Sequence, residues 1–167
     1  MDGEAKMKFN NHRRRSGRAM WARRWIYTAI FAVMGFTGFG QLPIFNRYYI
    51  SDIPGMAWAA NFYVTHTIHY LGAIFLIGFV TYISLDYLLA GTGRLKLTAS
   101  AYLRIAFLGG IIITGVFRVL KNLPNVTFSP NFTLFIDLSH LGFMMAYLLT
   151  ALLFLIIRSG WIAEEPI

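Results

Sequence analysis

The chain contains no cysteine among its 167 residues. This absence excludes disulfides, thiolate-held iron–sulfur clusters, haem attached through a C-x-x-C-H motif and cysteine nucleophiles. Any metal chemistry must therefore use histidine, of which the chain has four.

Charge is also scarce, because only 13% of the residues are charged whereas 57% are hydrophobic. The mean hydropathy of +0.56 is too high for a soluble domain of this size. Each apolar segment is close to the about 20 residues that a membrane-spanning helix needs. None alternates with a two-residue period, which excludes a membrane β-barrel. We therefore predict an all-α integral membrane protein, a bundle of four transmembrane helices at Trp25 to Leu42, Asn61 to Leu89, Ala101 to Leu120 and Leu134 to Ile157.

Acidic residues are few, since seven of them face fifteen lysines and arginines, and the net charge is +8. The excess comes mostly from the first 24 residues, which hold Lys6, Lys8, Arg13, Arg14, Arg15, Arg18, Arg23 and Arg24. Beside a membrane span, such a tail indicates cytoplasmic orientation and attraction to anionic lipid rather than nucleic-acid binding.

The connections between the segments differ in charge. The one after the second segment is basic, with Arg94, Lys96 and Arg104, whereas residues 43–60 and 121–133 carry Arg47 and Lys121 against Asp52. We therefore predict that both termini are cytoplasmic and that the second and fourth segments enter from the outer face. The chain then divides into a basic cytoplasmic tail (1–24), a membrane domain (25–157) and a short cytoplasmic tail (158–167).

Three histidines lie inside apolar segments: His66 and His69 in the second, and His140 in the fourth. A polar ring in hydrocarbon needs a partner. If the second segment enters the membrane near Asn61 and the fourth near Phe132, His69 and His140 each lie about eight residues in, about 12 Å deep. Two imidazoles at one level fit axial ligation of one b-type haem, and His66, one turn further out, is an alternative ligand. The competing interpretation is a hydrogen bond to a serine or carbonyl of a neighbouring helix.

Short motifs in the first and third segments recur in a known family. The stretch "RRWIYTAIFAVMGFTG" ends in Thr37-Gly38, and "YLRIAFLGGIIITGVFR" contains Thr114-Gly115, about 25 residues before His140. In their order and spacing, residues 21–157 resemble the four-helix cytochrome b (gamma) subunit of respiratory formate dehydrogenases and the related subunits of nickel–iron hydrogenases.

The resemblance implies particular site residues. Family members usually hold two haems, but Arg24 and Phe154 stand where the inner-haem ligands would be, so this chain resembles a one-haem version that keeps the outer haem. Gly72 follows His69 as a small residue follows the family's ligand, which favours His69 with His140 as ligands and His66 as a neighbour of a propionate or quinone. Arg118 and Lys121, at the end of the third segment, are expected to neutralise the propionates, unless they are ordinary interfacial anchors.

The function that the resemblance implies is electron transfer rather than complete catalysis. The chain would be a membrane-anchoring subunit in a bacterial or archaeal cytoplasmic membrane. It would pass electrons through one haem b between the quinone pool and an extracytoplasmic iron–sulfur or cytochrome subunit, which is attached to a catalytic subunit. One alternative is a haem-free structural anchor of a larger complex. Another is a small proton-linked transporter using His66, His69 and Asp86, which the absence of inverted repeats and broken helices disfavours.

Overall fold

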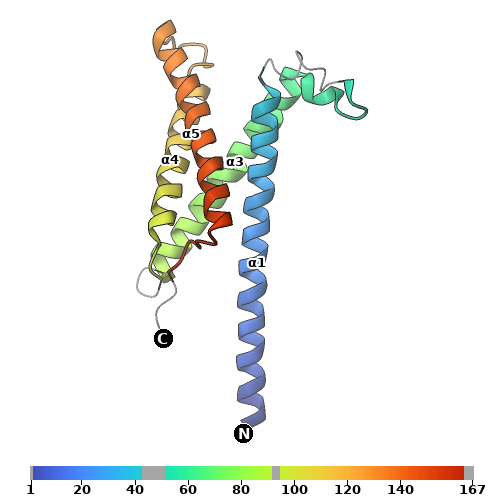
Figure 1. The fold of residues 1–167 in the computed structure, drawn as a ribbon, viewed down its shortest axis with the longest axis vertical. Coiled ribbons are helices and arrows are strands. Elements are labelled where there is room, and N and C mark those ends of the chain that lie inside the picture. The colour runs from blue at the N-terminus through green and yellow to red at the C-terminus, as the bar shows by residue number, and fades with distance from the viewer. Residues whose placement is uncertain (1, 43–51, 92–94, 164–167) are drawn as a thin grey trace. The chain divides into compact units, whose positions relative to one another are not determined.

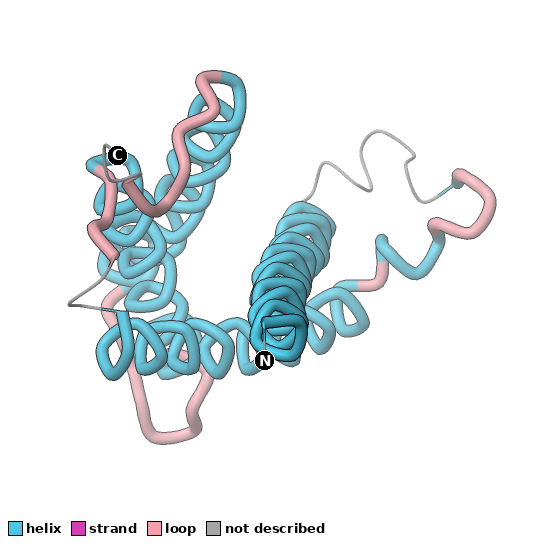
Figure 2. The backbone as a smooth tube through the Cα atoms, turned by 90° about the horizontal axis from the view of Figure 1, so that it is seen from below, coloured by secondary structure: helices cyan, strands magenta, loops and turns pink. Residues whose placement is uncertain are grey.

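The computed structural model describes residues 2–42, 52–91 and 95–163, and the side chains of 20–42, 52–89 and 95–163. Arg47, Arg94 and the basic side chains up to Arg18, which entered the topology prediction, lie outside this part of the chain. The described elements, in chain order, are α1 (Asp2–Gly40), the short 3-10 helix η2 (Ala57–Ala60), α3 (Phe62–Asp86) with the π-helical turn η3 (Tyr87–Gly91), α4 (Ala99–Leu120) and α5 (Pro130–Ile156). The described residues form no strand beyond one isolated bridge, Leu97 with Ile162, which confirms the all-α prediction (Figure 2).

Within the described residues, three helices are long and apolar enough to cross a membrane: Phe62–Leu89, Ala99–Leu120 and Pro130–Ile156. Only 6%, 22% and 6% of their most apolar windows are buried inside the protein, so their large hydrophobic side chains point outward. A water-soluble fold would bury such surface, whereas lipid solvates it. The chain is thus a multi-pass helical membrane protein.

The helix α1 differs from the other three. Its backbone is helical from Asp2, so the basic residues and the apolar segment share one helix. The uncharged part begins only after Arg24 and ends with the helix at Gly40, which is shorter than the about 20 residues that a span requires. The structure therefore shows three candidate spans, and the fourth stays a prediction.

The chain divides into two compact units, Met1–Leu85 and Asp86–Ile167. In the first unit, α1 and α3 run antiparallel (Figure 1). At one end Arg23 donates to the Tyr82 hydroxyl at 3.0 Å. At the other end Gly40 brings α1 close to Thr65, because a Cβ on Gly40 would lie 3.1 Å from Cγ2 of Thr65. Asn61 caps α3, since its Oδ1 accepts from the Tyr63 amide at 3.0 Å.

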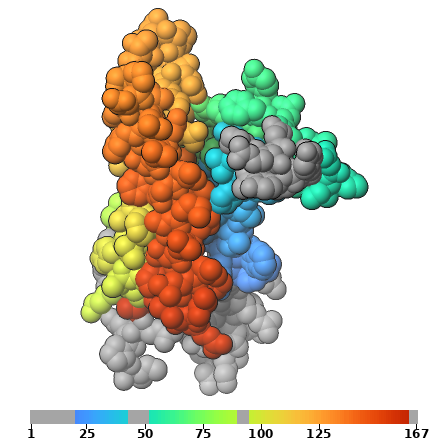
Figure 3. Space-filling model, turned by 45° about the horizontal axis from the view of Figure 1, so that its top comes forward, coloured from blue at the N-terminus to red at the C-terminus, as the bar shows by residue number. Residues whose placement is uncertain are grey.

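In the second unit, α4 and α5 pack side by side and antiparallel (Figures 1 and 3). Gly110 allows their close approach, because a Cβ there would meet the Phe143 ring at 2.8 Å. The Thr98 side chain caps α4. Its amide donates to the Trp161 carbonyl at 3.1 Å, which ties the segment after α5 to the start of α4.

Candidate functional site

His69 is held by a threonine of the facing helix in the first unit. Its Nδ1 lies 3.1 Å from Oγ1 of Thr37, whose residue is only 1% exposed. The Thr37 hydroxyl also lies 2.7 Å from the Val33 carbonyl oxygen. A hydroxyl has one hydrogen and a carbonyl can only accept, so Thr37 donates to Val33 and accepts from the imidazole. We therefore assign the proton to Nδ1 of His69, which leaves the lone pair on Nε2.

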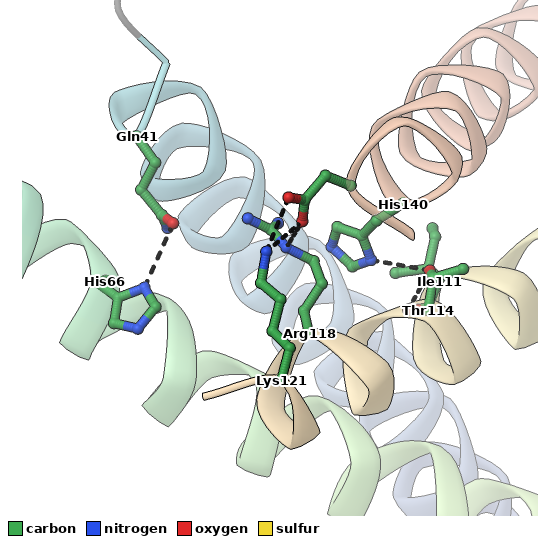
Figure 4. A network of polar contacts seen from close by, with 8 residues as sticks. Gln41, His66, Ile111, Thr114, Arg118, Lys121 and His140 are labelled. Atoms are coloured by element: carbon green, nitrogen blue, oxygen red, sulfur yellow. Dashed lines mark hydrogen bonds and ion pairs between the residues drawn. The ribbon is translucent and has the colours of Figure 1, made fainter. Parts of the chain in front are cut away.

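His140 is held in the same way in the second unit. Its Nδ1 lies 3.0 Å from Oγ1 of Thr114, and Figure 4 draws this contact as a dashed line. The Thr114 hydroxyl lies 2.6 Å from the Gly110 carbonyl oxygen, to which it donates. The same reasoning places the proton of His140 on Nδ1 and its lone pair on Nε2.

A glycine follows each of these threonines and lies against the same imidazole. A Cβ on Gly38 would lie 3.3 Å from Cε1 of His69, and a Cβ on Gly115 would lie 3.4 Å from Cε1 of His140. Side chains at these positions would press on the ring edges. Each Thr-Gly pair thus forms a cradle for one imidazole, the threonine accepting a hydrogen bond and the glycine leaving room. Both Thr-Gly pairs could be recognised in the sequence as motifs, but their shared role in holding an imidazole could not.

His66 has different surroundings. Its Nδ1 lies 3.4 Å from Oε1 of Gln41, whose Nε2 donates to the Thr37 carbonyl at 3.3 Å. The ring stacks on Phe62 at a centroid distance of 5.1 Å and meets Tyr70 edge-on at 4.5 Å. No Thr-Gly cradle holds this histidine in the described part of the chain. The manner of support therefore separates His66 from His69, although the two lie one turn apart on α3.

The two glycines near the histidines, which the sequence suggested as space for a macrocycle, differ in their neighbours. A Cβ on Gly72 would lie 2.5 Å from Sδ of Met34, so this glycine accommodates a side chain of α1. A Cβ on Gly142 would meet nothing within 4 Å. The prediction that Gly72 contacts a cofactor would thus require Met34 to move.

Arg118 and Lys121 meet on a carboxylate that the sequence analysis did not single out. Asp137 of α5 lies 3.0 Å from Nε of Arg118. Both of its oxygens accept from Nζ of Lys121 at 2.8 Å (Figure 4). Two cations on one anion leave a formal charge of +1. Asp137 could have been found, because it is the only acid in the last apolar segment and precedes His140 by three residues, on the same helix face.

The structure also describes the surroundings of Phe154, at one of the two positions where the resemblance would place an inner-haem ligand. The Phe154 ring lies under the Arg104 guanidinium at 4.8 Å, and the Trp161 ring lies 5.0 Å from the same group. Arg104 is 6% exposed and donates through Nη2 to the Ser159 carbonyl at 2.8 Å. Phe154, which stands where the resemblance would expect an imidazole, thus offers its ring to a buried cation instead.

Within each unit, the structure brings the predicted residues together with their supports. The first unit holds His66, His69 and Gly72, and the second holds His140, Arg118 and Lys121. Among the side chains that the structure describes, no three of the His, Cys, Asp and Glu types cluster as a bare metal ion would require. A haem needs only two protein ligands, because the porphyrin supplies the other four nitrogens.

Comparison with known proteins adds no family assignment. No protein family matches the chain, and neither a curated protein nor a solved structure is significantly similar to it.

Proposed function

We propose that the chain is a membrane-anchoring cytochrome b-type subunit in which His69 and His140 ligate one haem b. Electrons would pass through it between an extracytoplasmic redox subunit and the quinone pool. The observation that carries this proposal is the matched contact of the two imidazoles, each with Nδ1 about 3 Å from a buried threonine hydroxyl, 3.1 Å for His69 and 3.0 Å for His140. With the proton assigned to Nδ1, the lone pair lies on Nε2. This is the state in which histidine binds a metal.

The donor set fits a b-type haem. Metal-ligating histidines commonly donate their second ring nitrogen to a protein acceptor, which fixes the tautomer and the ring orientation. A histidine that only packs between helices also needs a hydrogen bond, but packing alone does not require the same Thr–His geometry in both units. When bound, the haem supplies one-electron transfer. His69 and His140 would supply the protein's two nitrogen ligands to the iron, and Thr37 and Thr114 would hold their rings.

The Arg118–Lys121–Asp137 cluster supports the same proposal. Its formal charge of +1 lies one helical turn from His140 on α5. Haem propionates are anionic, so Arg118 and Lys121 would attract them while Asp137 moderates the charge. An uncompensated pair of cations at this depth would be costly, which gives Asp137 a structural reason as well.

The membrane arrangement that goes with this function has four spans. We propose that α1 crosses with the other three helices, so that both termini lie in the cytoplasm of a bacterium or archaeon. The extracytoplasmic partner would be an iron–sulfur or cytochrome subunit attached to a catalytic subunit. The threonine-held histidines lie toward the predicted outer ends of their helices, on the side where such a partner would dock.

A visible spectrum tests the proposal. The chain, produced with haem available and purified in detergent, should show a reduced b-type α band. His140→Ala should abolish it, because no other histidine exists in the second unit. His12→Ala, in the basic tail, is the matched control and should keep the band. A purified chain that is folded and haem-free would overturn the electron-transfer proposal and favour the structural anchor.

A further inference from the structure

We propose that Thr37 and Thr114 are positioning residues that set the electron-donor strength of the two axial histidines, and thereby the reduction potential of the haem. This inference rests on the proposed function and adds to it a pair of residues that do not touch the iron. Each threonine would act through the one hydrogen bond that it accepts from an imidazole Nδ1–H.

The burial of both threonines makes these hydrogen bonds hard to replace. Thr37 is 1% exposed and Thr114 is 8% exposed, so water cannot take over either acceptor role. Both hydroxyls are also committed to a carbonyl four residues earlier, at 2.7 Å for Thr37 and 2.6 Å for Thr114. A hydroxyl that donates is polarised into a better acceptor. Each imidazole therefore faces a threonine oxygen that is fixed in place and strengthened as an acceptor.

The consequence for a bound haem follows from ligand basicity. An acceptor on Nδ1–H increases the basicity of the imidazole and strengthens its donation through Nε2. Stronger donation stabilises ferric iron over ferrous iron and lowers the reduction potential. Removing the acceptor should therefore raise the potential.

The two units hold their histidines with nearly the same distances. The Thr–His distances are 3.1 and 3.0 Å, and the distances from the following glycine's Cβ position to Cε1 are 3.3 and 3.4 Å. Equal geometry predicts equal influence on the iron from each side. Loss of either hydroxyl should shift the potential by a similar amount, and loss of both should shift it by about the sum.

The experiment is a redox titration of the purified haem-containing chain and its threonine variants. Thr37→Val and Thr114→Val replace the acceptor with a methyl group of similar size. Loss of a contact that supports a metal ligand typically changes metal affinity or activity about 10- to 100-fold. If the preference for ferric iron falls about tenfold, the one-electron reduction potential rises by about 59 mV. Thr37→Ser and Thr114→Ser restore the hydroxyl and should restore the potential.

Thr65→Val is the matched control. Thr65 is fully buried on α3, and within the described part of the chain its hydroxyl bonds to the carbonyls of Asn61 and Phe62, at the start of the same helix. This variant should leave the potential unchanged, which separates an effect of the histidine contact from a general effect of losing a buried hydroxyl. If a valine variant fails to accumulate, the alanine variant at the same position removes the hydroxyl without a crowding methyl group and carries the same prediction.

The outcomes separate this inference from the function beneath it. A wild-type chain without haem would overturn the proposed function. A wild-type bis-histidine haem whose potential stays fixed in the valine and alanine variants would leave that function standing and overturn the role of the threonines. A shift that serine does not reverse, or that Thr65→Val reproduces, would also overturn it.

Discussion

Asp137 of α5 accepts from Lys121 of the adjoining connection with both carboxylate oxygens, each 2.8 Å from Nζ. Arg118 completes the cluster through Nε at 3.0 Å. The carboxylate thus offsets one of two cations near the C-terminal end of α4. Its removal would change the local charge without touching either proposed ligand.

Asp137→Asn should raise the reduction potential of the haem, because a cluster of +2 disfavours ferric iron more than one of +1. For a separation on the order of 10 Å, a unit charge contributes about 1.7 kcal/mol at an effective dielectric constant near 20, and salt reduces this effect. Redox titration at low and high salt measures both. Asp52→Asn, at an exposed position before α3, is the control that should change nothing. A lowered potential in Asp137→Asn would contradict the electrostatic role of the cluster.

The choice between His66 and His69 can be decided by paired substitutions. His69→Ala should abolish the bis-histidine spectrum, because the threonine-held ring is lost. His66→Ala should keep it, since that ring is held by Gln41 and aromatic neighbours rather than by a Thr-Gly cradle. Visible spectra of the two purified variants give the answer. The reverse pattern would move the ligand about 4.5 Å outward along α3.

Two adjacent glycines of α4 predict opposite effects on stability. A Cβ on Gly110 would lie 2.8 Å from the Phe143 ring, whereas a Cβ on Gly109 would meet nothing within 4 Å. Gly110→Ala should destabilise the second unit by about 1–3 kcal/mol through overpacking. Gly109→Ala should be neutral or stabilising by up to about 1 kcal/mol from helix propensity. Thermal unfolding in detergent measures the difference, and equal melting of the two variants would contradict the close packing of α4 and α5.

The number of spans has a direct consequence for the termini. Three crossings place the N- and C-termini on opposite sides of the membrane, and four place them on the same side. Reporter fusions after Leu42 and after Ile167 should report the outside and the cytoplasm respectively. A cytoplasmic report after Leu42 would mean that α1 does not cross, and the depth match between His69 and His140 would lose its basis.

The sequence predicted the three candidate spans of the structure well, because each is a long run of apolar residues that hydropathy detects. The third and fourth predicted segments begin at Ala101 and Leu134, whereas the helices begin at Ala99 and Pro130. The difference arises because each helix starts beside a polar cap, Thr98 and Ser129, which hydropathy does not recognise. Hydropathy also does not report the backbone conformation of a charged segment, so it could not reveal that the charged tail is helical from Asp2.

The candidate site was predictable in its histidines and not in their supports. A histidine in an apolar segment is visible in one sequence, and so is a recurring Thr-Gly pair. Which face of one helix meets which face of another depends on packing, so the contacts of Thr37 with His69 and of Thr114 with His140 required the structure. Asp137 was visible as an isolated acid, but its ion pairs with Arg118 and Lys121 were not.

The central claim is one haem b held by His69 and His140, and a pyridine haemochrome assay on the purified chain tests it most directly. The assay counts haem per chain and identifies its type. The expected result is one haem b per chain in the wild type and none in the His69→Ala, His140→Ala double variant. No haem in a folded wild-type chain, or an undiminished count in the double variant, would contradict the account.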